Sequence, residues 1–257
     1  MRYPTFPPLG PIQATCPSCG WKRLHSFYVL DGVPTNSCIM LASQVEALEF
    51  PRGVIHLCSC PKCAFVTNVR FDPQQVEYSQ RYEETQSFSG TFNAFARSLA
   101  EDLIERYDLH EKEIAEIGCG KGEFLALLCE LGDNRGLGID PGCRPARLKE
   151  SPAGARLQFI QEVYAPGQLS EQVDFVACRH VLEHIPDPLR FLRQIRADLG
   201  DREDVRVLIE VRDLLKQPYR DHVSDHRGGS EYHRVLLGQR VHAVFDEAME
   251  RGGHLKR

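Results

Sequence analysis

The sequence predicts an α/β fold in which a small cysteine-rich segment precedes a doubly wound parallel sheet. A loop with glycine at alternate positions, residues 118–122, follows a short apolar run and opens an apolar helix. Glycine tolerates the sharp turn that this change of direction requires. Short apolar runs then alternate with helical or loop segments up to about residue 210, which is typical of a parallel sheet covered on both faces. Two Cys-Pro-x-Cys pairs stand upstream, at residues 16–19 and 60–63.

Composition indicates a globular chain and excludes several classes of function. The 257 residues, 42% hydrophobic and 26% charged, suit one large domain or two small ones. A net charge of −5 argues against a wide basic surface, so we expect no nucleic-acid partner. The sequence has no long apolar run and no basic-then-apolar start, which predicts no membrane association and a cytoplasmic location. In that compartment the ten cysteines are expected to be thiols or metal ligands.

The first predicted domain, residues 1–75, carries the two cysteine pairs. Each Cys-Pro-x-Cys turn presents two thiolates to one ion, and two such turns complete a tetrahedral site for a structural Zn²⁺. Strands at about residues 27–29 and 54–57 are expected to pair and bring the turns together. Cys58 is a rival ligand, and the alternative is that these thiols are all free. The expected ligands are Cys16, Cys19, Cys60 and Cys63.

Residues 76–112 form a predicted bridge to the sheet. Tyr78 and Tyr82 lie in a polar stretch that has no clear period, which indicates an ordered loop. Apolar residues then recur at helical spacing and predict a core-facing helix before the first strand. They are Phe92, Phe95, Ala96, Leu99, Leu103 and Tyr107.

The parallel sheet is predicted over residues 113–210. Its strands are expected at residues 114–117, 137–139, 157–160, 175–178 and 205–209. Ligands of such sheets bind at the carboxyl ends of the strands, where the glycine loop and Asp140 both stand. The dinucleotide fingerprint requires glycine at its sixth position. Counting from Gly118, that position is Glu123, so the pattern excludes this NAD-binding fingerprint.

The segment after the fourth predicted strand holds two histidines. His180 and His184 lie in the run Cys-Arg-His-Val-Leu-Glu-His, and histidine can act as an acid or a base near neutral pH. The alternative is that these side chains only hold the loop. Asp187 and Pro188 suit the N-cap and first position of a helix that ends near Leu199.

The order Glu-x-Gly-x-Gly-x-Gly with a downstream aspartate resembles the class I S-adenosylmethionine (SAM) methyltransferases, which have a Rossmann-like fold. The resemblance implies that the glycine loop passes under the methionine part of SAM and that Asp140 binds the ribose. The Val-Leu-Glu-His-Ile run resembles the segment of that family that lines the junction between SAM and the acceptor. The alternative is a plain tight turn. The implied cofactor-binding residues are Glu116, Gly118, Gly120, Gly122, Asp140, Tyr82, Arg179 and His180.

The cysteine pairs, tyrosine-rich bridge, glycine loop and histidine segment together resemble one narrower family, the zinc-containing C-methyltransferases that act on nucleotide-linked deoxysugars. That resemblance implies a small-molecule acceptor, with a keto-deoxysugar nucleotide as one candidate. It also implies a base near a ketone, for which the match is Tyr219 to His222, with His184 as a further candidate catalytic residue. The alternative is a solvated loop at residues 219–222.

The C-terminal segment, residues 211–257, departs from that narrower family, whose members continue with further strands and a second lobe. Here Val235, Leu236, Val241 and later apolar residues allow one amphipathic helix, which predicts an incomplete sheet edge. Two other functions therefore remain open: methylation of oxygen or nitrogen, and a zinc-stapled SAM-binding interaction module without turnover. The sequence predicts neither the acceptor nor the oligomeric state.

Overall fold

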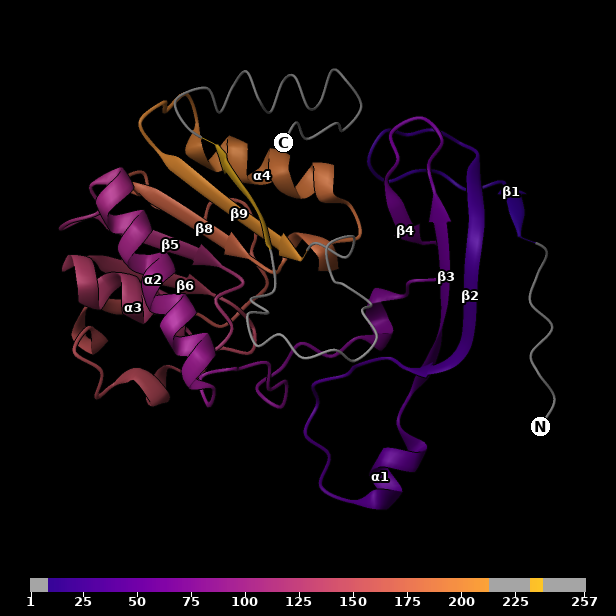
Figure 1. Ribbon diagram of the computed structural model, residues 1–257, viewed down its shortest axis with the longest axis horizontal. Coiled ribbons are helices and arrows are strands. Elements are labelled where there is room, and N and C mark those ends of the chain that lie inside the picture. Colours follow the sequence, from indigo (N-terminus) through magenta and orange to yellow (C-terminus); the bar gives the residue numbers. More distant parts are fainter. Residues whose placement is uncertain (1–8, 213–231, 238–257) are drawn as a thin grey trace, which may run out of the picture. The chain divides into compact units, whose positions relative to one another are not determined.

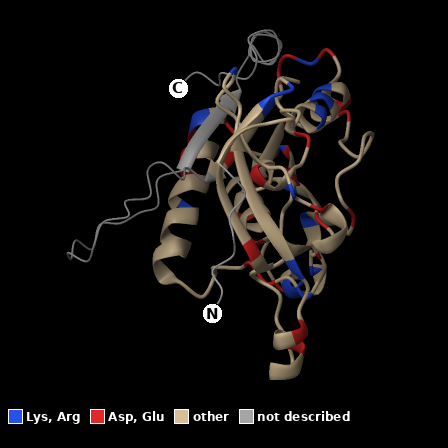
Figure 2. Cartoon of the chain, turned by 90° about the vertical axis from the view of Figure 1, so that its right-hand side faces the viewer, with Lys and Arg blue, Asp and Glu red and all other residues tan. Residues whose placement is uncertain are grey.

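The computed structural model describes residues 9–212 and 232–237, which group into two compact units (Figure 1). The first unit holds the described residues up to Glu84 together with residues 186–193. The second holds residues 85–185 and the described part of residues 194–241. Among the described residues, no helix combines the length and the apolar character needed to cross a membrane. Lys and Arg lie interspersed with Asp and Glu along the described chain (Figure 2).

An antiparallel sheet forms the centre of the first unit. Its four strands follow the order of the chain. The longest two pair over most of their length, with Val29 opposite His56 and Leu30 opposite Ile55, which confirms the predicted pairing between the two cysteine turns. The elements of this unit are β1 (Gly10–Ile12), β2 (Leu24–Pro34), α1 (Gln44–Glu49), β3 (Arg52–Ser59), β4 (Val66–Asn68) and η1 (Pro73–Gln75).

A six-stranded sheet forms the centre of the second unit, in the order β10-β9-β8-β5-β6-β7. Five of its strands are parallel, and they match the five runs predicted from the sequence. All residues of β8 are buried, as expected for a sheet covered on both faces. The strands are β5 (Glu113–Ile117), β6 (Arg135–Ile139), β7 (Leu157–Ile160), β8 (Phe175–Arg179), β9 (Arg206–Arg212) and β10 (Tyr232–Leu237).

Helices α2 (Gly90–Tyr107) and α3 (Glu123–Gly132) cover one face of this sheet (Figure 1). The predicted stripe of α2 packs there, with Leu99 and Leu103 almost fully buried against α3 and the strands. The Ser89 hydroxyl caps α2 by accepting a hydrogen bond from the Phe92 N–H. The remaining helical turns of this part of the chain are η2 (Pro145–Leu148), η3 (Gly154–Arg156) and η4 (Leu182–His184).

Helix α4 (Pro188–Leu199) begins as the sequence predicts. The Asp187 carboxylate accepts a hydrogen bond from the Arg190 N–H at 3.0 Å, as an N-cap residue should. At the other end of the helix, the Asp198 carboxylate accepts a hydrogen bond from the Tyr164 hydroxyl at 2.8 Å. This contact ties the end of α4 to the loop after β7.

The predicted C-terminal helix is wrong where the structure describes it. Val235 and Leu236 lie in β10, which pairs antiparallel with β9 from Tyr232 opposite Arg212 to Leu237 opposite Val207. An extended strand partner at the sheet edge therefore overrides the helical spacing of these residues. The sheet gains a sixth strand at the edge that was predicted to be incomplete. The other residues of the predicted helix lie outside the described residues.

Candidate functional site

The glycine loop joins β5 to α3 at the carboxyl end of the parallel strands. Gly118, Gly120 and Gly122 have φ angles of 70°, 55° and 83°, which lie in the left-handed region that side chains disfavour. The Gly118 N–H donates to the carbonyl of Ile139 at the end of β6, at 2.8 Å. Gly118 and Gly120 stay partly exposed. The loop therefore presents main-chain atoms to a ligand between the ends of β5 and β6.

Replacing Gly118 with alanine is expected to destabilise the chain by more than about 2 kcal/mol. A Cβ at this position would lie 2.1 Å from Cγ2 of Val181 and would also strain the positive φ. Gly167 is a matched control because its φ is 84° but a Cβ there meets nothing within 4 Å. Denaturant unfolding should show a larger loss of unfolding free energy for Gly118→Ala than for Gly167→Ala. Adding Val181→Ala to the Gly118→Ala variant should recover part of this difference, because it removes the clashing methyl group. Equal losses would contradict the steric argument.

Asp140 follows β6 and faces the same loop. Its Oδ2 accepts a hydrogen bond from the Gly120 N–H at 3.0 Å, and its Oδ1 accepts one from the Gly142 N–H at 2.6 Å. Burial raises the pKa of Asp140, against the two backbone donors and the positive charge of Lys121. A carboxylate offers about four acceptor positions, and these backbone contacts use two. The partly exposed side chain thus retains capacity for two hydroxyl donors, which fits a ribose.

A buried charged cluster lies beneath the glycine loop. Glu116 of β5 is 3% exposed, Arg179 of β8 is 8% exposed, and Glu210 of β9 is fully buried. The Arg179 Nε donates to Glu210 Oε2 at 2.6 Å, and its guanidinium lies 3.9 Å from the ring centroid of Phe124. Burial raises the pKa of Glu116 to about 8, with the charge of Arg179 opposing this change. These side chains join the carboxyl ends of three strands. The predicted contacts of Glu116 and Arg179 with SAM stay predictions.

The histidine segment lies against the glycine loop through Val181. His180 has a φ of 55°, and its N–H donates to the carbonyl of Glu210 at 2.7 Å. Its Nδ1 lies 3.6 Å from Oε1 of Glu183. Burial acts to raise the pKa of Glu183, but the interaction with His180 outweighs burial and holds this pKa below its usual value. An ionised Glu183 can therefore orient the His180 ring, while His184 stands exposed in η4.

Three predicted site residues belong to the first unit or lie outside the described residues. Tyr82 belongs to the first unit, where it forms a bridge with Ile39 and an edge-to-face contact with Tyr78 at 5.6 Å between ring centroids. Its role in cofactor binding stays a prediction. Tyr219 and His222 lie outside the described residues, so the base that they were predicted to supply also stays a prediction.

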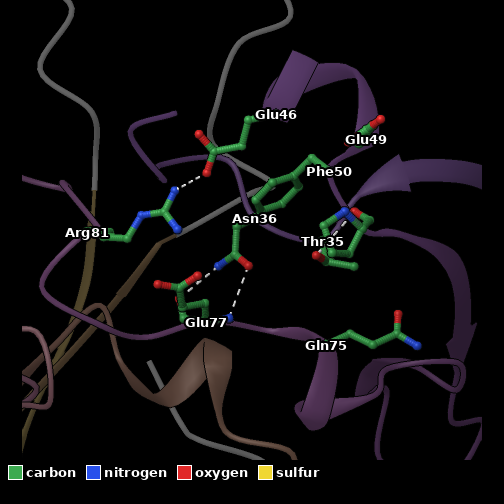
Figure 3. A pocket seen from close by; sticks show the side chains of 9 residues that line it. Thr35, Asn36, Glu46, Glu49, Phe50, Gln75, Glu77 and Arg81 are labelled. Carbon is green, nitrogen blue, oxygen red and sulfur yellow. Dashed lines mark hydrogen bonds and ion pairs between the residues drawn. The ribbon is translucent and has the colours of Figure 1, made fainter. Parts of the chain in front are cut away.

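A cavity of about 280 Å³ lies within the first unit (Figure 3). One side is closed by an ion pair between Arg81 and Glu46, whose Nη2 and Oε1 atoms are 2.5 Å apart. The Asn36 side chain donates to the Glu77 carbonyl at 3.0 Å and accepts from the Glu77 N–H at 3.1 Å. Phe50 supplies an aromatic wall. None of the residues that line the cavity is one of the predicted site residues.

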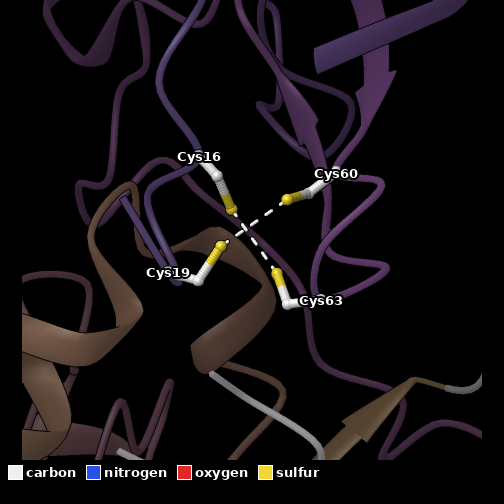
Figure 4. Close-up of side chains that lie close together, drawn as sticks. All are labelled: Cys16, Cys19, Cys60 and Cys63. Atoms are coloured by element: carbon white, nitrogen blue, oxygen red, sulfur yellow. Dashed lines mark hydrogen bonds between the residues drawn. The ribbon is translucent and has the colours of Figure 1, made fainter. Parts of the chain in front are cut away.

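The four predicted zinc ligands come together in the first unit (Figure 4). The sulfur atoms of Cys16, Cys19, Cys60 and Cys63 all lie within 4.8 Å of one another. Two of the distances between sulfur atoms are 3.6 Å, from Cys16 to Cys63, and 3.5 Å, from Cys19 to Cys60. A tetrahedral Zn²⁺ with Zn–S bonds of about 2.3 Å would place its sulfurs about 3.8 Å apart. The cluster thus has the size of a four-cysteine zinc site.

The two cysteine turns share one backbone pattern. In the first turn, the Cys16 N–H donates to the Trp21 carbonyl and the Gly20 N–H donates to the Cys16 carbonyl. In the second turn, the Cys60 N–H donates to the Phe65 carbonyl and the Ala64 N–H donates to the Cys60 carbonyl. Two turns of equal geometry thus present their thiols to one point. Cys58 is fully buried but is not part of the cluster of four. The rival ligand that the sequence suggested is therefore not one of the converging thiols.

Sequence reasoning did not single out three polar residues of the site. Lys121 lies inside the glycine loop and is only 2% exposed. Glu210 interrupts an apolar strand, and an acid in such a run signals a buried partner. Glu183 lies three residues after His180, the spacing of neighbours on a helical turn. The sequence contained these signals, but their partners become evident only from the folded chain.

Comparison with known proteins identifies a family. Residues 92–244 match the family described as a methyltransferase domain. Ubiquinone biosynthesis O-methyltransferases of Pseudomonas fluorescens (strain SBW25) and Aeromonas salmonicida (strain A449) are 36% and 42% identical over 97 and 96 residues. The matches cover 35% and 34% of this chain, and 41% and 38% of those proteins. The chain thus matches about two fifths of the length of these curated relatives.

Two solved structures are similar to part of this chain. A putative S-adenosyl-L-methionine-dependent methyltransferase of Methanococcus maripaludis has a TM-score of 0.45 and 15% identity, covering 54% of this chain and 66% of its own. Magnesium protoporphyrin IX methyltransferase of Synechocystis PCC 6803, with bound SAM, has a TM-score of 0.38 and 22% identity, covering 46% and 58%. The family match, which spans more than half of the sequence, decides the assignment: this chain belongs to the methyltransferase domain family.

Proposed function

We propose that the chain transfers a methyl group from SAM to a hydroxyl oxygen of a small molecule. The observation that carries the cofactor is the pairing of the glycine loop with Asp140 at the carboxyl ends of β5 and β6. Ligands of open α/β sheets bind at this position. The loop would lie under the methionine part and Asp140 would accept the ribose hydroxyls. Bound SAM supplies an electrophilic methyl group, and the protein orients the acceptor and removes its proton.

The curated relatives, named as O-methyltransferases, favour oxygen as the acceptor atom. Oxygen methylation requires a base that takes a hydroxyl proton as the methyl transfers. His184 is exposed in η4, and the neighbouring His180 is oriented by Glu183. Both histidines follow β8, the strand beside β5. We therefore assign His184 as the candidate general base and His180 as its neighbour on the cofactor side.

The test is methyl transfer from isotope-labelled SAM to a panel of phenols, catechols and keto-sugar nucleotides, with the product identified by NMR. We expect the labelled methyl group to be bonded to an oxygen atom that was a hydroxyl group of the acceptor. His184→Ala should lower turnover by about a hundredfold or more, the usual contribution of a general base, and should leave SAM affinity unchanged. His110→Ala, an exposed histidine at the other end of β5, is the matched control. Full turnover by His184→Ala would exclude this base.

Carbon methylation of a keto-deoxysugar is the second proposal, and it rests on the resemblance to the zinc-containing family. Its specific support in the structure is the four-cysteine cluster. The two proposals differ in the position of the label and in the residue required: carbon chemistry predicts that His222→Ala stops turnover with SAM affinity intact. SAM binding without transfer to any acceptor would instead favour the interaction module. A structural Zn²⁺ and a cytoplasmic location belong to these proposals too.

A further inference from the structure

Lys121 is a charged side chain in a place where charge is costly. It lies between two glycines of the cofactor loop and is 2% exposed. A buried ammonium ion is unfavourable unless nearby groups compensate it. Its Nζ donates to the carbonyl of Gly142 at 2.8 Å. The side chain therefore reaches from the glycine loop to the loop that follows β6.

This contact closes a ring of hydrogen bonds around the ribose-binding carboxylate. The Gly142 N–H donates to Asp140 Oδ1, and the Gly120 N–H donates to Asp140 Oδ2. Lys121 follows Gly120 directly in the sequence, and its Nζ donates to the carbonyl oxygen of the same Gly142. The carboxylate, the two loops and the ammonium thus hold one another in position.

We propose that Lys121 is a positioning residue for SAM binding, whose ammonium holds the loop after β6 and keeps the partly buried Asp140 carboxylate ionised. This inference rests on the proposed cofactor. A carboxylate must be charged to accept two hydroxyl donors on top of its two backbone donors, because a protonated carboxyl group loses acceptor capacity. Lys121 is the compensating positive charge that the loop itself provides.

Three other titratable groups interact electrostatically with Asp140: Glu116 of β5, Cys119 of the glycine loop and Cys143 of the next turn. Burial raises the pKa of each of them, and the charge of Asp140 adds to this rise, so none of them supplies a positive charge to Asp140. Burial also raises the pKa of Asp140, and the charge of Lys121 lowers it. Removing that charge should therefore raise the pKa further. Asp140 would then protonate, and SAM affinity would fall, as the pH decreases through the new pKa.

The experiment compares SAM affinity by calorimetry between about pH 5.5 and about pH 8.5 for the wild type, Lys121→Gln and Lys121→Arg. Glutamine keeps an N–H donor for the Gly142 carbonyl but carries no charge, whereas arginine keeps the charge. Lys149→Gln removes an exposed lysine and matches the change in net charge. For Lys121→Gln we expect an affinity loss at the acidic end that is about tenfold greater than at the alkaline end, one pKa unit being tenfold. The other two variants should follow the wild-type profile.

A profile of Lys121→Gln parallel to that of the wild type would overturn the proposal, whatever the absolute affinity. If Lys121→Gln does not fold, the double variant Lys121→Gln/Asp140→Asn decides. Recovered thermal stability would support charge compensation, because the double variant removes both charges, and failure to recover would overturn it. This comparison needs no ligand. If the wild type does not bind SAM, the cofactor assignment is rejected, and the stability comparison still tests the coupling between Lys121 and Asp140.

Discussion

Replacing Asp140 with alanine is expected to weaken SAM binding by more than about a hundredfold. Two hydroxyl hydrogen bonds to a charged acceptor contribute about 1.5 kcal/mol or more each, and about 3 kcal/mol corresponds to more than a hundredfold in affinity. The variant also loses the acceptors for the Gly120 and Gly142 N–H groups. Calorimetric titration of the full chain measures the effect.

The control for this variant is Glu150→Ala, which removes an exposed carboxylate from the segment after η2. It should bind SAM as the wild type does. Circular dichroism should show that Asp140→Ala keeps its secondary structure, and thermal unfolding should show a lower Tm, because the variant leaves the buried Lys121 ammonium without the neighbouring carboxylate. Wild-type affinity in Asp140→Ala would place the ribose elsewhere and would remove the main support for the cofactor site.

Removing the proposed Zn²⁺ is expected to unfold the first unit. Binding of a structural Zn²⁺ by four cysteines contributes about 10 kcal/mol or more to folding, which is comparable to the whole stability of a small domain. Elemental analysis should find one zinc per chain in the wild type and none in Cys60→Ser/Cys63→Ser. Limited proteolysis of that variant should then cut within residues 9–84, which the proposed metal would protect in the wild type.

Cys58→Ala is the matched control for the cysteine variants. Cys58 is fully buried next to the cluster but its thiol is not among the four that converge. The variant should keep its zinc and its resistance to proteolysis, with only the modest loss that a small buried truncation causes. If the double serine variant is equally resistant without metal, the cluster is a set of packed thiols, as the alternative from the sequence holds.

The fold was predictable where local pattern and tertiary environment agree. The five parallel strands are short apolar runs buried on both faces, so their hydrophobicity marks them without knowledge of their neighbours. The apolar stripe of α2 and the N-cap at Asp187 are likewise local signals. In strand β10 the local pattern and the tertiary environment disagree. Val235 and Leu236 have a spacing that suits a helix, and only pairing with β9 makes them a strand.

The candidate site divides in the same way. The glycines, Asp140 and the four cysteines were predicted because each belongs to a short motif with its own chemistry. The contacts of Lys121 with Gly142 and of Arg179 with Glu210 join residues 21 and 31 positions apart. No local pattern specifies such pairs, because they form only when the parallel strands bring separate loops to one edge of the sheet.

The sequence by itself determined the class of fold, the methyltransferase family and the set of converging thiols, because glycine dihedrals, apolar burial and thiol spacing are properties of short segments. Only the tertiary structure decided which charges compensate one another around the cofactor loop. The physical reason is that the cost of a buried charge depends on its partners. The partners of Lys121 and Arg179 lie on loops and strands that the chain reaches much later.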